Sequence, residues 1–127
     1  MKKSHTLNYG RHLVDEDDIQ SVVSVLRGDL ITQGPVVQQF EAALAEKVEA
    51  SHAIAVTSAT AALHLACLAS GLKFGSLGVT SAMTFVASAN AMKYCGADIG
   101  LSDIDPNSLC ISPKSLKSLI DESPEVE

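Results

Sequence analysis

The sequence predicts an α/β fold with a parallel sheet, and three observations support this prediction. Short apolar segments alternate with helical patterns from residue 53 onward, at the spacing of strand–helix–strand units joined by right-handed crossovers. Hydrophobic residues make up 46% and charged residues 19% of the chain, which are globular proportions. The 127 residues allow one domain that buries roughly two-thirds of its unfolded surface. Because there is no Trp and aromatic residues are only 4%, the core is expected to consist of Ala, Val, Leu and Ile.

Two amphipathic helices are predicted ahead of the first strand. The first follows the acidic run Asp15–Asp18, whose charges suit the positive end of a helix dipole, and it ends at Gly28. Its apolar positions recur at helical spacing: Ile19, Val22, Val23 and Leu26. The second helix begins at Pro35, after the loop 30–35, and runs to about Val48. Its apolar positions are Val37, Phe40, Leu44 and Val48.

Three short strands, each followed by a helix, are predicted in the rest of the chain. The strands are 53–56, 78–81 and 98–104, and the helices are 61–70, 85–94 and 113–120. Gly71 and Gly96 are placed to end the first two of these helices. The helix 61–70 is apolar on nearly every side, so we expect most of its surface to be buried.

Charge, cysteines and hydropathy exclude several classes of protein. Nine Lys and Arg against 15 Asp and Glu give a net charge of −6, which argues against a nucleic-acid-binding module. Three Cys and four His are scattered without a CxxC motif, so neither a disulfide framework nor a zinc site is expected, and a cytoplasmic location is favoured. The N-terminus lacks the apolar core of a signal peptide. The uncharged stretch Ala53–Leu72 is rich in Ala, Ser and Thr, so we interpret it as a buried strand–turn–helix rather than a membrane span.

The turn at Ser58, Ala59 and Thr60 is the candidate binding site. It follows a predicted strand and opens a predicted helix, where free backbone N–H groups and the helix dipole attract a phosphate. Ligands of parallel sheets bind beyond the carboxyl ends of the strands, which is where this turn lies. The alternative is that Ser58 or Thr60 only caps the helix, and composition alone favours that interpretation.

The other polar and aromatic candidates can each be explained by a structural role as well as by a functional one. Phe85 could cover a flat ring, or it could be a core residue. His64 is interpreted as a hydrogen-bonded core residue, and Asp103 and Asp105 as turn-forming residues next to Pro106. No nucleophile–base pair can be assembled, so no catalytic residue and no metal ligand is assigned. Neither GxGxxG nor GxxxxGK[ST] occurs.

Several motifs, taken in order, resemble one known family. They are Tyr9-Gly10-Arg11, LITQGPVV at 30–37, Phe40-Glu41, AVTSATAALHL at 55–65, MTFVASANA at 83–91 and DIDP at 103–106. Together they resemble the start of the DegT/DnrJ/StrS family of pyridoxal-phosphate-dependent nucleotide-sugar aminotransferases, from residue 8 to about 119. The Tyr-Gly-Arg opening and the Thr-Gln-Gly-Pro loop are most similar to the UDP-4-amino-4,6-dideoxy-N-acetyl-altrosamine transaminase branch.

The resemblance implies a fold and a cofactor site. The fold would be the N-terminal part of the fold-type-I large domain, a three-layer α/β/α architecture with a mainly parallel sheet, truncated in this chain. A single incomplete domain over 1–127 would contain a helical segment at 1–50, the start of the cofactor-binding large domain at 51–120 and an acidic end at 121–127. Ser58, Ala59 and Thr60 would hold the phosphate of pyridoxal 5′-phosphate, and Phe85 would stack on its ring. Ala59 stands where the family has Gly.

The resemblance also implies a reaction and its partners. Family members transfer an amino group from glutamate to a nucleotide-linked 4-keto sugar, for polysaccharide or glycan precursors, and they act as homodimers. The lysine that binds the cofactor, the acidic residue at the pyridine nitrogen and the small C-terminal domain would lie beyond Glu127, so we expect the isolated chain to be inactive. The alternatives are a non-catalytic truncated gene product, a small phosphate-binding or subunit-pairing α/β module, and an independent nucleotide-binding domain.

Overall fold

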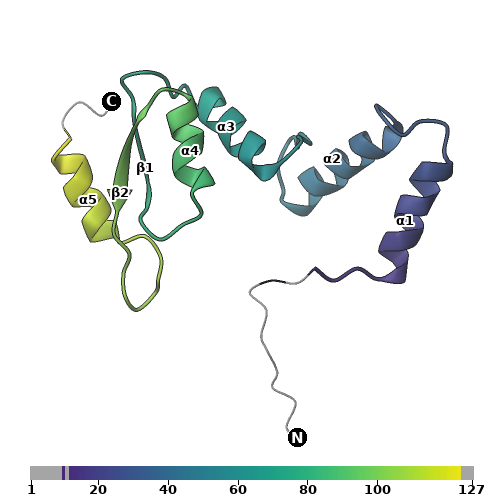
Figure 1. Ribbon diagram of the computed structural model, residues 1–127, viewed down its shortest axis with the longest axis horizontal. Coiled ribbons are helices and arrows are strands. Elements are labelled where there is room, and N and C mark those ends of the chain that lie inside the picture. The colour runs from purple at the N-terminus through teal and green to yellow at the C-terminus, as the bar shows by residue number, and fades with distance from the viewer. Residues whose placement is uncertain (1–9, 11, 124–127) are drawn as a thin grey trace, which may run out of the picture. The chain divides into compact units, whose positions relative to one another are not determined.

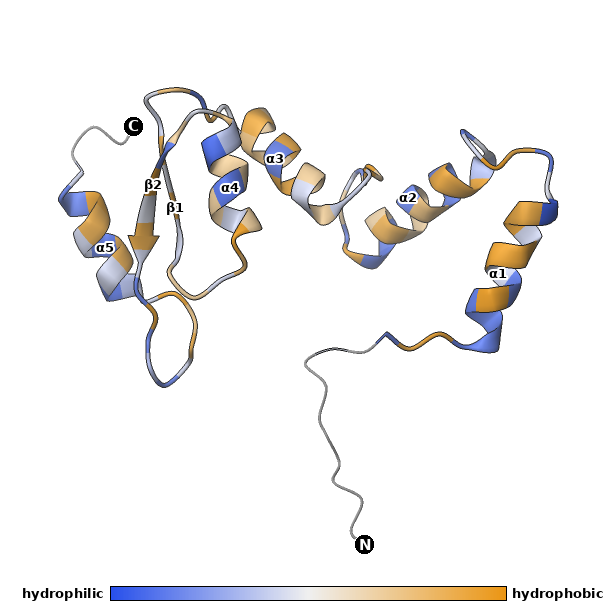
Figure 2. Ribbon diagram, viewed as in Figure 1, coloured by the Kyte–Doolittle hydropathy of each residue, from blue (hydrophilic) through white to orange (hydrophobic). Residues whose placement is uncertain are grey.

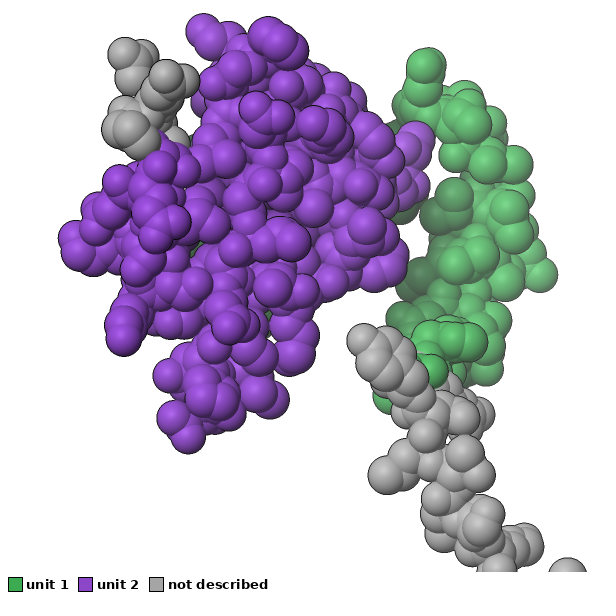
Figure 3. All heavy atoms as spheres, turned by 60° about the vertical axis from the view of Figure 1, so that its left-hand side comes forward, with its two compact units in different colours: residues 1–55 green, residues 56–127 purple. Residues whose placement is uncertain are grey.

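The computed structural model describes residues 10 and 12–123, which belong to two compact units (Figure 3). Unit 1 covers residues 1–55, and unit 2 covers residues 56–127. The described residues form five α-helices and two β-strands, in the order shown in Figure 1. None of the helices in this described part is long and apolar enough to cross a membrane.

Unit 1 contains two helices, α1 (Glu16–Arg27) and α2 (Pro35–Lys47). Both agree with the sequence-based prediction. The start of α1 is a capping box, in which the Asp15 side chain accepts from the Asp18 amide at 3.0 Å and the Asp18 side chain accepts from the Asp15 amide at 3.1 Å. Gly28 ends α1, and Pro35 occupies the first turn of α2.

The predicted strand at residues 53–56 is wrong. The structure has no strand there, and Ile54 is 81% exposed. A strand exists only through backbone pairing with a neighbour. The two described strands pair with each other instead, and the Ala55 amide donates to the Glu41 carboxylate at 2.7 Å. The apolar pattern of residues 53–56 therefore predicted a strand that has no pairing partner among the described residues.

Unit 2 is an α/β unit with a parallel pair of strands. Its elements are α3 (Ala59–Ala69), β1 (Leu77–Ser81), α4 (Ala87–Tyr94), β2 (Asp98–Ser102) and α5 (Pro113–Asp121). The strands pair in register from Leu77 opposite Asp98 to Ser81 opposite Ser102, which confirms the predicted parallel sheet. Several boundaries differ from the prediction by one or two residues. The largest differences are that α3 begins at Ala59, that α4 begins at Ala87, and that β2 ends at Ser102, because Ile104 instead makes an isolated antiparallel bridge with Ile111.

Two helices cover opposite faces of this sheet. A Cβ built on Gly78 of β1 would meet Met92 of α4, whereas a Cβ built on Gly100 of β2 would meet Leu119 of α5 at 2.9 Å. Gly78 is opposite Ile99, and Val79 is opposite Gly100, so the two glycines point to different faces of the pleat. Helix, sheet and helix thus form three layers in unit 2, with α3 packed against α4 (Figure 1).

The buried core is smaller and of different composition than the sequence predicts. The buried apolar side chains of unit 2 are Ala87, Ala91, Met92 and Ala97, and Ala45 is the buried one of unit 1. Large aliphatic side chains remain exposed on α1, α2, α3 and α5. Figure 2 shows the hydrophobic positions of these helices as orange ribbon segments. The expectation that most of α3 is buried is also wrong, because none of its residues is buried and Leu65 is 50% exposed. Small side chains let α4 approach the strands closely, but the described elements are too few to cover the larger ones.

Candidate functional site

The turn before α3 places Ser58 at the N-cap position. The backbone of Ser58 is extended, with φ −164° and ψ 161°, and its Oγ accepts a hydrogen bond from the Ala61 amide at 3.2 Å. The Ser58 carbonyl accepts from the Ala62 amide at 3.0 Å, which starts the helical hydrogen-bond pattern. The capping interpretation of Ser58 is therefore confirmed.

Capping leaves the first two amides of α3 available for a ligand. The N–H groups of Ala59 and Thr60 have no partner within residues 10 and 12–123, and Ser58, Ala59 and Thr60 are all exposed. The Ser58 hydroxyl accepts from Ala61 but keeps its own proton for donation, and Thr60 adds a second hydroxyl. Two amides, two hydroxyls and the positive end of a helix form a surface that can bind a phosphate. The capping and phosphate interpretations of this turn are compatible.

Ala59 fits this turn without backbone strain. It is the first residue of α3, and it is not among the non-glycine residues of the described chain with positive φ. A glycine is required only where the backbone enters the left-handed region or where a Cβ has no room. Since Ala59 is exposed, its methyl group points to open surface in this unit.

Phe85 lies in the segment that connects β1 to α4. Its side chain is 76% exposed, so the interpretation of Phe85 as a core residue is wrong for this chain. Its carbonyl accepts from the Ser88 amide at 3.0 Å, which fixes the turn into α4. Figure 1 shows that α4 begins at the end of unit 2 where β1 and β2 finish. Phe85 and the Ser58–Thr60 turn therefore each precede one of two helices, α4 and α3, that pack against each other.

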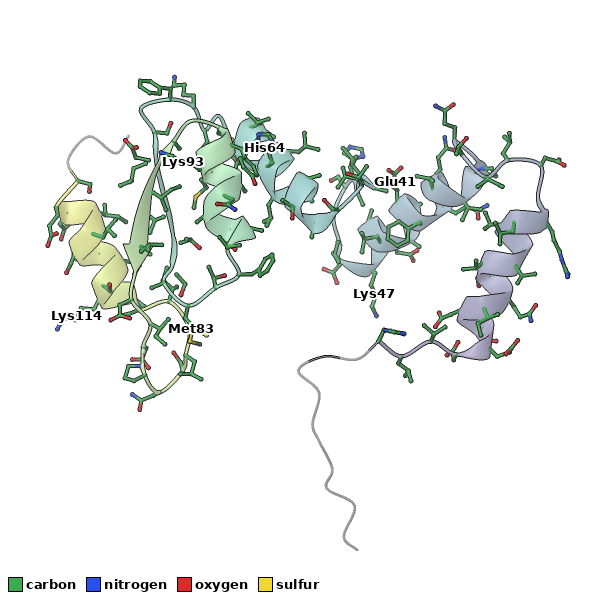
Figure 4. All side chains as sticks on the ribbon, in the orientation of Figure 1. Glu41, Lys47, His64, Met83, Lys93 and Lys114 are labelled. Atoms are coloured by element: carbon green, nitrogen blue, oxygen red, sulfur yellow. The ribbon has the colours of Figure 1, made fainter. Side chains whose placement is uncertain are left out.

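The other polar candidates have structural roles. The His64 ring of α3 meets the Tyr94 ring of α4 edge to face, with centroids 5.5 Å apart and planes at 69°, and Figure 4 labels His64. His64 is half-buried, and its contact is this aromatic edge rather than the hydrogen bond that the sequence suggested. Another candidate, Asp105, accepts hydrogen bonds from the amides of Ser108 at 3.0 Å and Asn107 at 2.9 Å.

The turn around Asp105 has an electrostatic consequence. The Ser108 amide first, and the Asn107 amide second, hold the pKa of Asp105 below its usual value, because both hydrogen bonds favour the charged carboxylate. Asp103 similarly accepts from the Ile104 amide at 2.8 Å. The turn-forming interpretation is confirmed for Asp105, whereas the Asp103 carboxylate precedes the turn and, among the described residues, accepts only from the neighbouring Ile104 amide. The part of the chain that the structure describes contains no cluster able to hold a metal ion.

One interaction within unit 1 had no sequence signal. Glu41, which Figure 4 labels, lies on α2 and accepts from the Ala55 amide. The two residues are 14 positions apart, and neither periodicity nor charge pattern pairs them. Only the folded backbone of unit 1 brings them together.

Comparisons with known proteins agree on one family. Residues 12–125 match the DegT/DnrJ/EryC1/StrS aminotransferase family. The chain is 41% identical over 119 residues to the spore coat polysaccharide biosynthesis protein SpsC of Bacillus subtilis, covering 94% of this chain and 31% of that protein. It is 38% identical over 98 residues to the UDP-4-amino-4,6-dideoxy-N-acetyl-beta-L-altrosamine transaminase of Campylobacter jejuni, covering 77% of this chain and 26% of the transaminase.

A solved structure supports the same assignment. The putative sugar aminotransferase Spr1654 from Streptococcus pneumoniae, in its PLP form, superposes with a TM-score of 0.79 at 29% identity. The match covers 84% of this chain and 27% of that one. The chain thus spans about a third or less of the length of the relatives that it matches. Fold and sequence therefore point to the same part of the same kind of protein.

Proposed function

The chain belongs to the DegT/DnrJ/EryC1/StrS aminotransferase family, and we propose that it forms the cofactor-phosphate-binding part of a pyridoxal-phosphate-dependent sugar aminotransferase. The observation that carries this proposal is the N-terminus of α3. There, two backbone amides without a partner in the described part of the chain, and two side-chain hydroxyls, belong to exposed residues in the turn that resembles the family's phosphate turn. The Spr1654 structure, which carries the cofactor, supports the choice of ligand.

The residues of this chain fit the two recognisable parts of the cofactor. A phosphate dianion would accept from the amides of Ala59 and Thr60 and from the hydroxyls of Ser58 and Thr60. The exposed ring of Phe85 would cover the flat pyridine ring and exclude water from one side of it. When bound, the cofactor supplies an electron sink for the carbon that loses a proton during amino transfer. The role of this chain is therefore to bind and orient the cofactor.

The names of two relatives support a proposal for the reaction of the whole enzyme. One is a transaminase of a UDP-linked amino sugar, and the other is a polysaccharide biosynthesis protein. We infer a nucleotide-linked 4-keto sugar as acceptor, glutamate as amino donor, a homodimer as the active assembly and a cytoplasmic location. None of this chain's seven lysines, at 2, 3, 47, 73, 93, 114 and 117, lies in the family's cofactor-binding motif. The isolated 127-residue chain is therefore expected to show no turnover in a glutamate-dependent assay, and measurable turnover would contradict this.

A pair of serine variants tests the phosphate site. Ser58 caps α3 and Ser112 caps α5, where its hydroxyl accepts from the Ser115 amide at 3.3 Å. Ser58→Ala and Ser112→Ala should each cost about 1 kcal/mol of stability, because each removes one N-cap. The ligand is pyridoxamine 5′-phosphate, which cannot form a Schiff base with surface lysines, and calorimetry measures its dissociation constant.

The two variants should differ in binding. We expect Ser58→Ala to raise the dissociation constant about tenfold, because it removes a hydrogen bond to a charged group. Thr60→Val should act in the same way, whereas Ser112→Ala should bind like the parent chain. Pyridoxamine without phosphate should not bind measurably. Equal affinities for Ser58→Ala, Thr60→Val and Ser112→Ala would contradict the proposed phosphate site.

A further inference from the structure

We propose that Cys67 and Cys95 form a redox-sensitive thiol pair, which a small disulfide of the glutathione class converts into a disulfide bond joining α3 to α4. The proposal concerns the α3–α4 contact alone and does not rest on the proposed cofactor site. Cys67 lies on α3, and Cys95 directly follows α4 as its C-cap residue. Both are half-buried, whereas Cys110 is exposed in the loop after β2.

The first argument is the face of α3 on which Cys67 lies. The half-buried positions of α3 are Ala61, His64 and Cys67, and every other residue of this helix is exposed. Residues three apart share one helix face. Because α4 is the element packed most extensively against α3, this face is the one directed at α4. Cys67 is therefore sheltered by α4.

The second argument is the aromatic contact beside the two thiols. His64 of α3 lies 5.5 Å from Tyr94 of α4 between ring centroids. Cys67 is one turn beyond His64 on the same face, and Cys95 is the residue after Tyr94. Two residues adjacent to a known contact between the helices thus each carry a sulfur atom. The Cys95 thiol donates to the Ala91 carbonyl at 3.4 Å, which fixes the direction of its side chain.

The third argument is electrostatic. Burial, and after it the negative charge of the Cys67 thiolate, raise the pKa of the Cys95 thiol. A charge on one sulfur can affect the other only when the two lie near each other. A raised pKa also makes Cys95 the poorer nucleophile at neutral pH, because only the thiolate attacks a disulfide. We therefore expect Cys67 to react first.

The chemistry is a thiol–disulfide exchange in two steps. The Cys67 thiolate attacks one sulfur of glutathione disulfide, which forms a mixed disulfide and releases one glutathione thiolate. Cys95 then loses its proton to solvent, and its thiolate attacks the Cys67 sulfur and releases the second glutathione. Two protein thiols are oxidised and one glutathione disulfide is reduced to two thiols. A reducing agent reverses both steps, which suits a cytoplasmic protein whose disulfides are transient.

The disulfide would connect the parts of α3 and α4 that lie away from their N-termini. Each of these helices is preceded by one candidate ligand segment, Ser58–Thr60 for α3 and Phe85 for α4. Oxidation would therefore fix the distance between the two segments. After reduction, only the noncovalent contact between α3 and α4 would maintain that distance. The cross-link should also stabilise the fold by restricting the unfolded chain.

The experiment uses the full chain carrying Cys110→Ser, which removes the exposed third thiol. The protein is incubated with glutathione disulfide, and its intact mass, its peptide map and its thermal midpoint are measured before and after reduction. We expect a monomer lighter by two hydrogen atoms, a single Cys67–Cys95 cross-linked peptide and a midpoint raised on the order of 10 °C. Reduction should reverse all three changes.

Single-cysteine variants complete the test. With Cys95→Ser added, the reaction should stop at a glutathione adduct on Cys67, and with Cys67→Ser added, the adduct on Cys95 should form several-fold more slowly. Two glutathione adducts on one chain, cross-linked dimers, or no reaction of the folded protein would each overturn the proposal. None of these outcomes bears on the proposed phosphate site, which the affinity for pyridoxamine 5′-phosphate tests separately.

Discussion

Gly78 of β1 lies directly under α4, where there is no space for a side chain. A Cβ at this position would collide with the Met92 sulfur and approach the Met92 Cβ and Cγ to 3.0 Å. The sulfur is at the end of a flexible side chain and can move, but Cβ is fixed by the backbone of α4. The glycine is thus required for the close approach of helix and strand.

Gly78→Ala should destabilise the protein by about 1–3 kcal/mol through overpacking. Urea unfolding of the single variant, of Met92→Ala and of the double variant measures this effect. The loss caused by Gly78→Ala should shrink in the Met92→Ala background, because the two residues compete for one space. Additive losses in the double variant would show that the collision is not the cause.

Asp105 makes the stability of unit 2 depend on pH. Because its folded pKa is lowered by the Ser108 and Asn107 amides, the carboxylate stabilises the fold at pH values above its ordinary pKa, and this stabilisation is lost as the pH falls through the lowered folded pKa. Asp105→Asn should therefore reduce the loss of stability on acidification below about pH 4. Unfolding midpoints over a pH series measure the difference.

The control for this prediction is Asp29→Asn. Asp29 is exposed, and its carboxylate has no hydrogen bond within the part of the chain that the structure describes. The acid sensitivity of this variant should match that of the parent chain. Equal acid sensitivity of Asp105→Asn and the parent chain would rule out the role assigned to Asp105.

At the scale of elements, one amide in the segment 53–56 is hydrogen-bonded to a side chain instead of to a neighbouring strand. The Glu41 carboxylate accepts a hydrogen bond from the Ala55 amide at 2.7 Å. In a sheet, a backbone carbonyl of the neighbouring strand would accept this bond. Glu41→Ala should speed hydrogen exchange of the Ala55 amide about tenfold, because it removes a hydrogen bond between a backbone amide and a charged acceptor. Glu41→Gln keeps an acceptor oxygen and should retain most of the protection. Unchanged exchange in Glu41→Ala would contradict the assigned bond.

Helix positions could be predicted from the sequence because their signals are local. Caps and breakers such as Asp15, Gly28 and Pro35 act within one turn of the helix that they start or end. The strand at 53–56 could not be predicted correctly, because pairing depends on a partner that no local pattern specifies. The sequence-based expectation of a buried α3 was wrong for a related reason. An apolar helix surface shows that a helix can be buried, but not that other elements are present to pack against it.

At the scale of the whole molecule, the position of the candidate turn was easier to predict than the core. Motif order indicated the Ser58–Thr60 turn, and the structure added the capping bond of Ser58 and two amides that have no partner among the described residues. The exposure of Phe85 and the alanine-rich core needed the folded chain. Exposed large apolar residues in both units are consistent with a chain that spans about a third of its relatives.

The most direct test of the central claim is an amide-resolved titration of the isotope-labelled chain with pyridoxamine 5′-phosphate. We expect saturable shifts of the Ala59 and Thr60 amides, because these two groups, which have no partner among the described residues, would donate to the phosphate. Inorganic phosphate should produce the same pattern at higher concentration, and pyridoxamine without phosphate should not. Saturation that leaves the amides of residues 58–60 unmoved, or no saturable shift at all, would contradict the account.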